Sequence, residues 1–109
     1  MIESILTASG VPYKQTRFAK PPAGSYAVYS DQIQTDGPDG LPGMIYRHSP
    51  TVVLYAPKQI DPAAEAAIEE AIAAHGLHYE KEGPEWDDQA QRYETIYEFS
   101  YTEKRRAKT

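Results

Sequence analysis

Residues 61–76 carry the sequence DPAAEAAIEEAIAAHG, which contains the start and end signals of one helix. Asp61 can accept hydrogen bonds from the first free N–H groups, Pro62 suits the first helical position, and Gly76 suits the left-handed residue that ends a helix. Small and apolar residues recur at spacings of three and four, which predicts one buried stripe made of Ala64, Ile68, Ala71, Ile72 and His75. A stripe this narrow lets a helix lie close against a sheet.

The acidic residues of this helix are expected to face water. Glu65, Glu69 and Glu70 lie mostly off the apolar stripe. Charged side chains are rarely buried unless they are paired, which favours a solvated position for all three.

The length and composition indicate a single small domain over residues 1–109. The chain has no cysteine, so disulfides, thiolate zinc sites and a cysteine nucleophile are excluded. Residues 1–6 lack the features of a signal peptide, and no apolar run approaches the roughly 20 residues that span a bilayer. We therefore expect a soluble protein that is made in the cytoplasm and has no membrane partner.

Short extended segments precede the helix. A first helix is predicted over residues 2–9, and Gly10 is its stop signal. The expected strands before residue 61 cover residues 11–18, 25–32, 44–48 and 51–55. Pro50 separates the last two, and because proline has no N–H to donate, it is expected to mark an edge, a bulge or a bend.

Two further strands are predicted after the helix, at residues 78–82 and 93–102, with a turn at 83–88 between them. Alternation is clearest in the last strand, where one face carries Tyr93, Thr95, Tyr97, Phe99 and Tyr101. The element order predicts an α+β fold, with a mainly antiparallel sheet of four to five strands and two helices packed on one face.

Two segments and a surplus of tyrosine suggest contacts with partners. Residues 35–43 hold three glycines and two prolines, which predicts a protruding loop, and residues 103–109 form a basic tail that we expect to be flexible. Nine tyrosines against two phenylalanines suit half-buried strand faces and protein interfaces. The candidate interface residues are Asp36, Asp39, Leu41, Tyr29, Tyr46, Trp86, Lys104, Arg105 and Arg106.

No catalytic, cofactor or metal site is predicted. His75 and His78 have a metal-like spacing, but Gly76 breaks the helix that would fix it. His48 lies beside Ser49, yet neighbouring residues of a strand point to opposite faces, so no Ser-His pair follows. The strand carboxylates Glu80, Glu82, Glu94 and Glu98 are interpreted as a solvated strand surface.

The order of local motifs resembles a known family. After the opening helix come GVPY at residues 10–13, YAVY at 26–29, the helix start at Asp61-Pro62, and GLHYEK at 76–81. The chain finishes with Glu85-Trp86 and the strand from Tyr93. In this order it resembles small head-tail connector or tail-completion proteins of long-tailed phages and prophages, which are similar in design to tail terminators.

The resemblance implies a structural subunit without enzymatic activity. It implies an α/β subunit that joins a homo-oligomeric ring, of about six copies, at the end of the tail tube, and that offers a docking face to the head connector. Its partners would be tail-tube and head-connector proteins, with DNA possible in the lumen. The expected location is the virion neck or tail, after assembly in the host cytoplasm.

Two other hypotheses come from different functional classes. A small monomeric nucleic-acid-binding or regulatory α+β module would use the basic cluster at residues 104–108 as its phosphate contact, although the acidic body argues against a broad nucleic-acid surface. A small hydrolase or metal enzyme would depend on His75 or His78.

Overall fold

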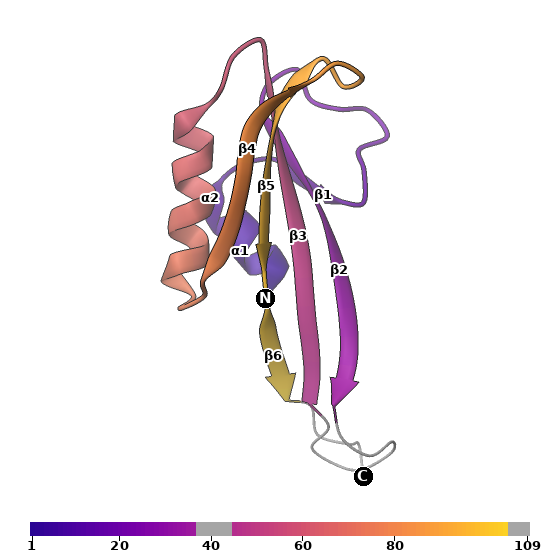
Figure 1. Ribbon diagram of the computed structural model, residues 1–109, viewed down its shortest axis with the longest axis vertical. Coiled ribbons are helices and arrows are strands. Elements are labelled where there is room, and N and C mark those ends of the chain that lie inside the picture. Colours follow the sequence, from indigo (N-terminus) through magenta and orange to yellow (C-terminus); the bar gives the residue numbers. More distant parts are fainter. Residues whose placement is uncertain (37–44, 105–109) are drawn as a thin grey trace.

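The structure, a computed structural model, describes residues 1–36 and 45–104. The elements are α1 (Ile2–Ser9), β1 (Tyr13–Gln15), β2 (Tyr26–Asp36), β3 (Ile45–Pro57), α2 (Pro62–Ala74), β4 (Tyr79–Asp87), β5 (Arg92–Phe99) and β6 (Tyr101–Lys104). The six strands form one sheet, and both helices pack on the same face of it (Figure 1). The predicted α+β fold with a mainly antiparallel sheet is confirmed, with six strands in place of four or five.

The sheet has the order β1-β2-β3-β5-β4, and β6 also pairs with β3. Every pairing is antiparallel except that of β1 with β2, which is parallel. The strand predicted at residues 11–18 is shorter in the structure, where β1 covers only Tyr13–Gln15. It ends at Gln15 because Thr16 adopts a left-handed φ of 69° and turns the chain out of the sheet.

The core lies between the helices and the middle of the sheet. Side chains from α1, α2 and the three central strands make one buried cluster, whose fully enclosed members include Ile5, Leu6, Val52, Leu54, Ile68, Ile72 and Tyr97. The alternation predicted for residues 93–102 holds, since Thr95, Tyr97 and Phe99 are all buried on the helix side.

Helix α2 begins and ends as the sequence predicts. Asp61 accepts a hydrogen bond from the Ala64 N–H at 3.1 Å, and Gly76 adopts a left-handed φ of 74° after the last turn. The predicted stripe is wrong at two positions: His75 is exposed and Glu65 is buried. Glu65 can be buried because β4 supplies a cation for it, as described below.

Pro50 does not interrupt β3, which runs unbroken through it. The interruption lies in the neighbouring strand. Thr51 pairs with Glu98 and His48 with Tyr101, so β5 and β6 keep one register against β3. Because Pro50 has no N–H to donate to this neighbour, the pairing lapses opposite it, and one long strand is divided into β5 and β6.

The turn predicted at residues 83–88 is instead a bulge inside β4. The register shifts between Glu82 and Glu85, and pairing then continues to Asp87, so the turn itself comes after that residue. Gly83 has a φ of 89°, and a Cβ there would lie 2.6 Å from the Glu94 carbonyl oxygen. Only glycine fits this position.

The first two residues of the basic tail differ from the prediction. Glu103 and Lys104 belong to β6, so the predicted flexible tail cannot begin at residue 103. Residues 105–109 and 37–44 lie outside the described part of the chain, and the latter include residues 37–43 of the predicted loop. The loop prediction is wrong for Thr35 and Asp36, which belong to β2. No helix within residues 1–36 and 45–104 is long and apolar enough to span a membrane.

Candidate functional site

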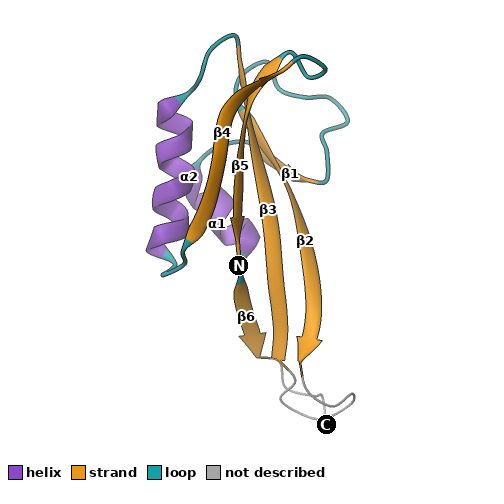
Figure 2. Cartoon of the chain, viewed as in Figure 1, coloured by secondary structure: helices purple, strands orange, loops and turns teal. Residues whose placement is uncertain are grey.

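The part of the sheet that the helices leave uncovered is a three-stranded arm (Figure 1, Figure 2). It consists of residues 30–36 of β2, residues 45–50 of β3 and all of β6. The molecule measures 52 Å along its longest axis and 28 and 20 Å across. The arm carries two exposed large apolar residues, Ile33 at 52% and Ile45 at 41%.

A buried histidine holds the three strands of the arm together at its base. His48 on β3 is 6% exposed. Its Nδ1 lies 2.6 Å from Asp31 Oδ2 on β2, and its Nε2 lies 3.3 Å from Glu103 Oε1 on β6. Each contact is a hydrogen bond when that ring nitrogen carries a proton. One side chain thus bridges both neighbouring strands.

An aromatic contact completes this cluster. The His48 and Tyr101 rings stack with centroids 4.5 Å apart and an angle of 7° between their planes. Burial, with the nearby carboxylates of Asp31 and Glu103, raises the pKa of Tyr101 above its ordinary value. The second Asp31 oxygen, Oδ1, is buried and makes no hydrogen bond within the described residues. Through the contacts of His48, the cluster cross-links β2, β3 and β6.

The two sides of the sheet differ in how their edges are protected. On β4 the consecutive charged residues Glu80, Lys81 and Glu82 and the bulge before Glu85 discourage another strand from adding to this edge. Residues 30–36 of β2 contain no lysine, arginine or proline, and they pair regularly with β3. The β2 edge thus lacks these protective features.

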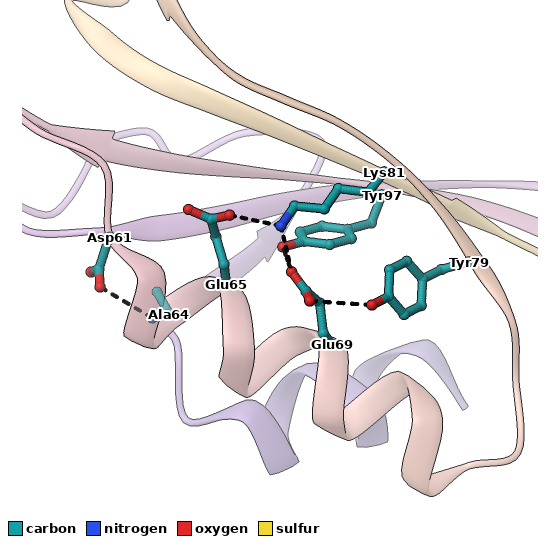
Figure 3. Close-up of polar contacts among 7 residues, drawn as sticks. All are labelled: Asp61, Ala64, Glu65, Glu69, Tyr79, Lys81 and Tyr97. Carbon is teal, nitrogen blue, oxygen red and sulfur yellow. Dashed lines mark hydrogen bonds and ion pairs between the residues drawn. The ribbon is translucent and has the colours of Figure 1, made fainter.

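A second polar cluster joins α2 to β4 (Figure 3). Lys81 Nζ lies 2.9 Å from Glu65 Oε1 and 2.8 Å from Glu69 Oε2. Glu69 also accepts hydrogen bonds from Tyr97 at 2.8 Å and from Tyr79 at 3.2 Å. Two helix carboxylates thus share one strand cation, which explains why Glu65 is buried.

The pKa directions in this cluster follow from its geometry. Burial alone raises the pKa of Glu69, but hydrogen bonds from Lys81 and Tyr97 outweigh it and leave that pKa below its ordinary value. The hydrogen bonds that Lys81 donates to Glu69 and Glu65 raise the pKa of Lys81. Burial and the bond to Glu69 strongly raise the pKa of Tyr97. These directions favour an ionised Glu69, a charged Lys81 and a neutral Tyr97, so the cluster holds α2 against β4 through charged hydrogen bonds.

The outer face of β4 and β5 is acidic. Glu80 pairs directly with Glu98, and Glu85 with Glu94, so like charges face each other across the strands. Burial, and then Asp87, raises the pKa of Glu94. In the described part of the chain, no group of three or more His, Asp or Glu side chains is placed to hold a metal ion.

The predicted interface residues fall in different environments. Tyr29 is 5% exposed in the core, where its hydroxyl donates to Glu3 at 2.8 Å, so its surface is closed to partners in this fold. Burial and that bond raise the pKa of Tyr29 to about 12. Tyr46 is half-buried on the arm. Trp86 is 43% exposed and packs against Tyr93 at the opposite end of the sheet.

The remaining predicted residues lie at or beyond the tip of the arm. Asp36 and Lys104 are the last described residues of β2 and β6, and both are paired with Ile45. Asp39, Leu41, Arg105 and Arg106 lie outside the described residues. The structure therefore gathers Asp36, Tyr46 and Lys104 on one arm and separates them from Tyr29 and Trp86.

Sequence reasoning missed the residues that give this site its shape. Asp31, His48 and Glu103 are far apart in the chain, and only the β2-β3-β6 pairing brings them together. A lone histidine in a strand gave no local signal of its partners. The contact between Glu65 and Lys81 was missed because helix periodicity predicts which residues of one helix are buried. It does not predict which strand lies beside that helix.

Neither the protein-family models nor the curated protein sequences with which the chain was compared contain a match. Its function therefore has to be inferred from its own residues.

Proposed function

We propose that this chain is a structural neck protein of a phage or prophage, which completes the tail tube and helps join it to the head as one subunit of a ring. The arm is the observation that supports this most. It extends paired backbone and exposed apolar side chains beyond the core, where they are available to other subunits. The family in this proposal comes from the resemblance of the strand, turn and helix-cap motifs.

A ring subunit needs two different surfaces, because each copy contacts one neighbour with one surface and the next neighbour with the other. The arm has such a pair, with β2 on one side of β3 and β6 on the other. The polar clusters around His48 and Lys81 join elements of the fold to each other. These features favour a role in assembly over a role in catalysis.

The resemblance supplies the finer parts of the proposal. They are a ring of about six copies, contacts with tail-tube and head-connector proteins, a lumen that passes DNA, and a location in the virion neck or tail. The nucleic-acid-binding alternative depends on basic residues of which only Lys104 is within the described range, and no described contact favours it.

Light scattering over a wide range of protein concentration tests the proposal, with electron microscopy of the largest species. We expect a closed ring near six times the 12.2 kDa mass of the chain. A 12.2 kDa species at every concentration would contradict a ring that assembles without a partner.

A further inference from the structure

Two strand edges of the arm are open within the described residues. On one side, the pairing of β1 with β2 ends at Tyr29, so residues 30–36 have no strand beside them. On the other side, β6 pairs only with β3, and the pairing of β4 with β5 ends at Phe99. Both open edges flank the same part of β3 (Figure 1).

Pro50 reveals which backbone groups of β2 point outward. Asp31 pairs with Pro50, which has no N–H, so this pair is of the type without direct hydrogen bonds. The N–H and C=O of Asp31 therefore point away from β3, and by alternation so do those of Ile33 and Thr35. The contacts with β1 agree, because the Ala27 N–H and Tyr29 C=O bond to Pro12 and Thr16 on that side.

The same alternation orients β6. The backbone groups of Pro50 face away from β2, so those of His48 and Tyr46 face β6 and bond to Tyr101 and Glu103. The backbone groups of Thr102 and Lys104 consequently point away from β3, to a side where no described strand pairs with β6. Among residues 1–36 and 45–104, each open edge thus has outward backbone donors and acceptors on every second residue that pair with no other strand.

We propose that a second copy of this chain docks on the arm by strand addition, with β2 of one copy pairing in parallel with β6 of the next. This inference rests on the proposed ring and identifies its subunit contact. Strands β2 and β6 run in the same direction, because both are antiparallel to β3. Neighbours related by rotation about an axis along the arm keep that direction, so β2 meets the next β6 in parallel.

The register of the arm fits this pairing. Thr35 and Glu103 are both paired with Tyr46, so they lie at the same level. In a parallel pair, one residue donates to and accepts from the two residues that flank its level partner. The outward groups of Thr35 would then meet those of Thr102 and Lys104, which are the outward ones on β6.

Side chains and charge favour unlike edges over like edges. Ile33 and Tyr101 are both paired with His48 and share its face, so pairing between copies places the exposed Ile33 beside Tyr101 of the second copy. The only charged residues in the open part of β2 are Asp31 and Asp36, whereas β6 leads into a basic sequence. Pairing of β2 with a second β2 would bring the acidic residues together.

Two proline substitutions test the inference. Ile33→Pro removes an outward N–H from β2, and Thr102→Pro removes one from β6, while neither removes a bond to β3. Ile33→Ala and Thr102→Ala are the matched controls, because they change the side chain and keep the N–H. Thermal melting of each variant checks that the fold persists. We expect each proline variant to need roughly tenfold or more protein to assemble, since proline removes a donor and its ring obstructs the incoming strand.

Mixing the two proline variants gives the decisive result. Ile33→Pro keeps an intact β6 edge and Thr102→Pro keeps an intact β2 edge, so the mixture should form dimers, twice the 12.2 kDa chain, and stop there. If the wild type forms rings and both proline variants do too, the ring stands and the strand pairing is overturned. If only Ile33→Pro fails to assemble, β2 pairs with β2 and the proposed contact is wrong. A wild type that stays monomeric overturns the pairing together with a self-assembling ring.

Discussion

Strands β2 and β3 run through both halves of the molecule, yet they are stabilised differently in each. In the body, their helix-side residues, such as Val52 and Leu54, are fully enclosed by α1 and α2. In the arm, the same face carries His48 with its two carboxylates, and then Ile33, which is half exposed. Apolar burial therefore stabilises the body, whereas backbone pairing and one polar cross-link stabilise the arm.

The largest expected effect comes from removing apolar volume in the body. Ile72 is fully enclosed, so Ile72→Ala should lower the free energy of unfolding by roughly 2 to 5 kcal/mol. Ile33→Ala in the arm is the matched control and should cost less than about 0.5 kcal/mol, because its side chain is 52% exposed. Urea denaturation measures both. Equal losses at the two positions would remove the distinction between body and arm.

A smaller loss is expected from the polar cluster between α2 and β4. Lys81→Met leaves Glu65 and Glu69 without their shared cation, and Glu65 is only 8% exposed. We expect a loss of roughly 1 to 3 kcal/mol, below the cost for a fully buried pair because Lys81 is partly solvated. Lys20→Met, at an exposed position, is the control. A cost for Lys81→Met no greater than that of the control would mean that the cluster contributes nothing.

A local effect is expected from the cross-link of the arm. His48→Ala removes the contacts with Asp31, Glu103 and Tyr101 and should cost about 1 to 2 kcal/mol. Hydrogen exchange should become faster in β6 and in the arm part of β2, with little change in α2. His78→Ala, at an exposed residue, provides the comparison. Uniformly faster exchange would show that the arm does not open separately from the body.

The smallest expected effects are on the pH dependence of the free energy of unfolding. Glu69 and Glu94, on opposite faces of the sheet, contribute to it with opposite signs. Glu69 has a lowered pKa, so its contribution is present above its unfolded-state pKa, about 4.3, and is lost as the pH falls through the folded-state pKa. Glu94 has a raised pKa, so its contribution is present at low pH and is lost as the pH rises through the folded-state pKa.

Melting temperatures across pH 3 to 8 separate these two carboxylates. Glu69→Gln should reduce the acid sensitivity of the fold, and Glu94→Gln should stabilise it near neutral pH. Glu70→Gln, at an exposed position of α2, is the control for a simple change of net charge. If Glu69→Gln and Glu94→Gln changed the melting temperature near neutral pH in the same direction, the two pKa directions would be contradicted.

Local signals predicted much of the body. The caps of α2, the stop at Gly10 and the alternation of β5 depend on neighbouring residues, so they could be predicted from short stretches of sequence. The burial of Glu65 could not, because it depends on Lys81 reaching the helix from β4. The same limit hid the cross-link, since His48 meets Asp31 and Glu103 only after three strands have paired.

Pro50 shows how a correct local principle can be applied to the wrong strand. Its missing N–H was expected to break the segment that contains it. The break lies instead between β5 and β6, because the lost donor faced that neighbour and not β2. A sequence alone does not say which neighbour a strand residue faces, so the consequence of this proline needed the sheet order.

Residue-resolved hydrogen exchange at low and high protein concentration tests the role of the arm most directly. If copies join through its edges, the outward amides of Ile33, Thr35 and Thr102 should become at least about tenfold more protected as the assembly forms, while exchange along the charged edge of β4 stays unchanged. Assembly that protects the β4 edge and leaves these three amides exchanging as in the monomer would contradict the account.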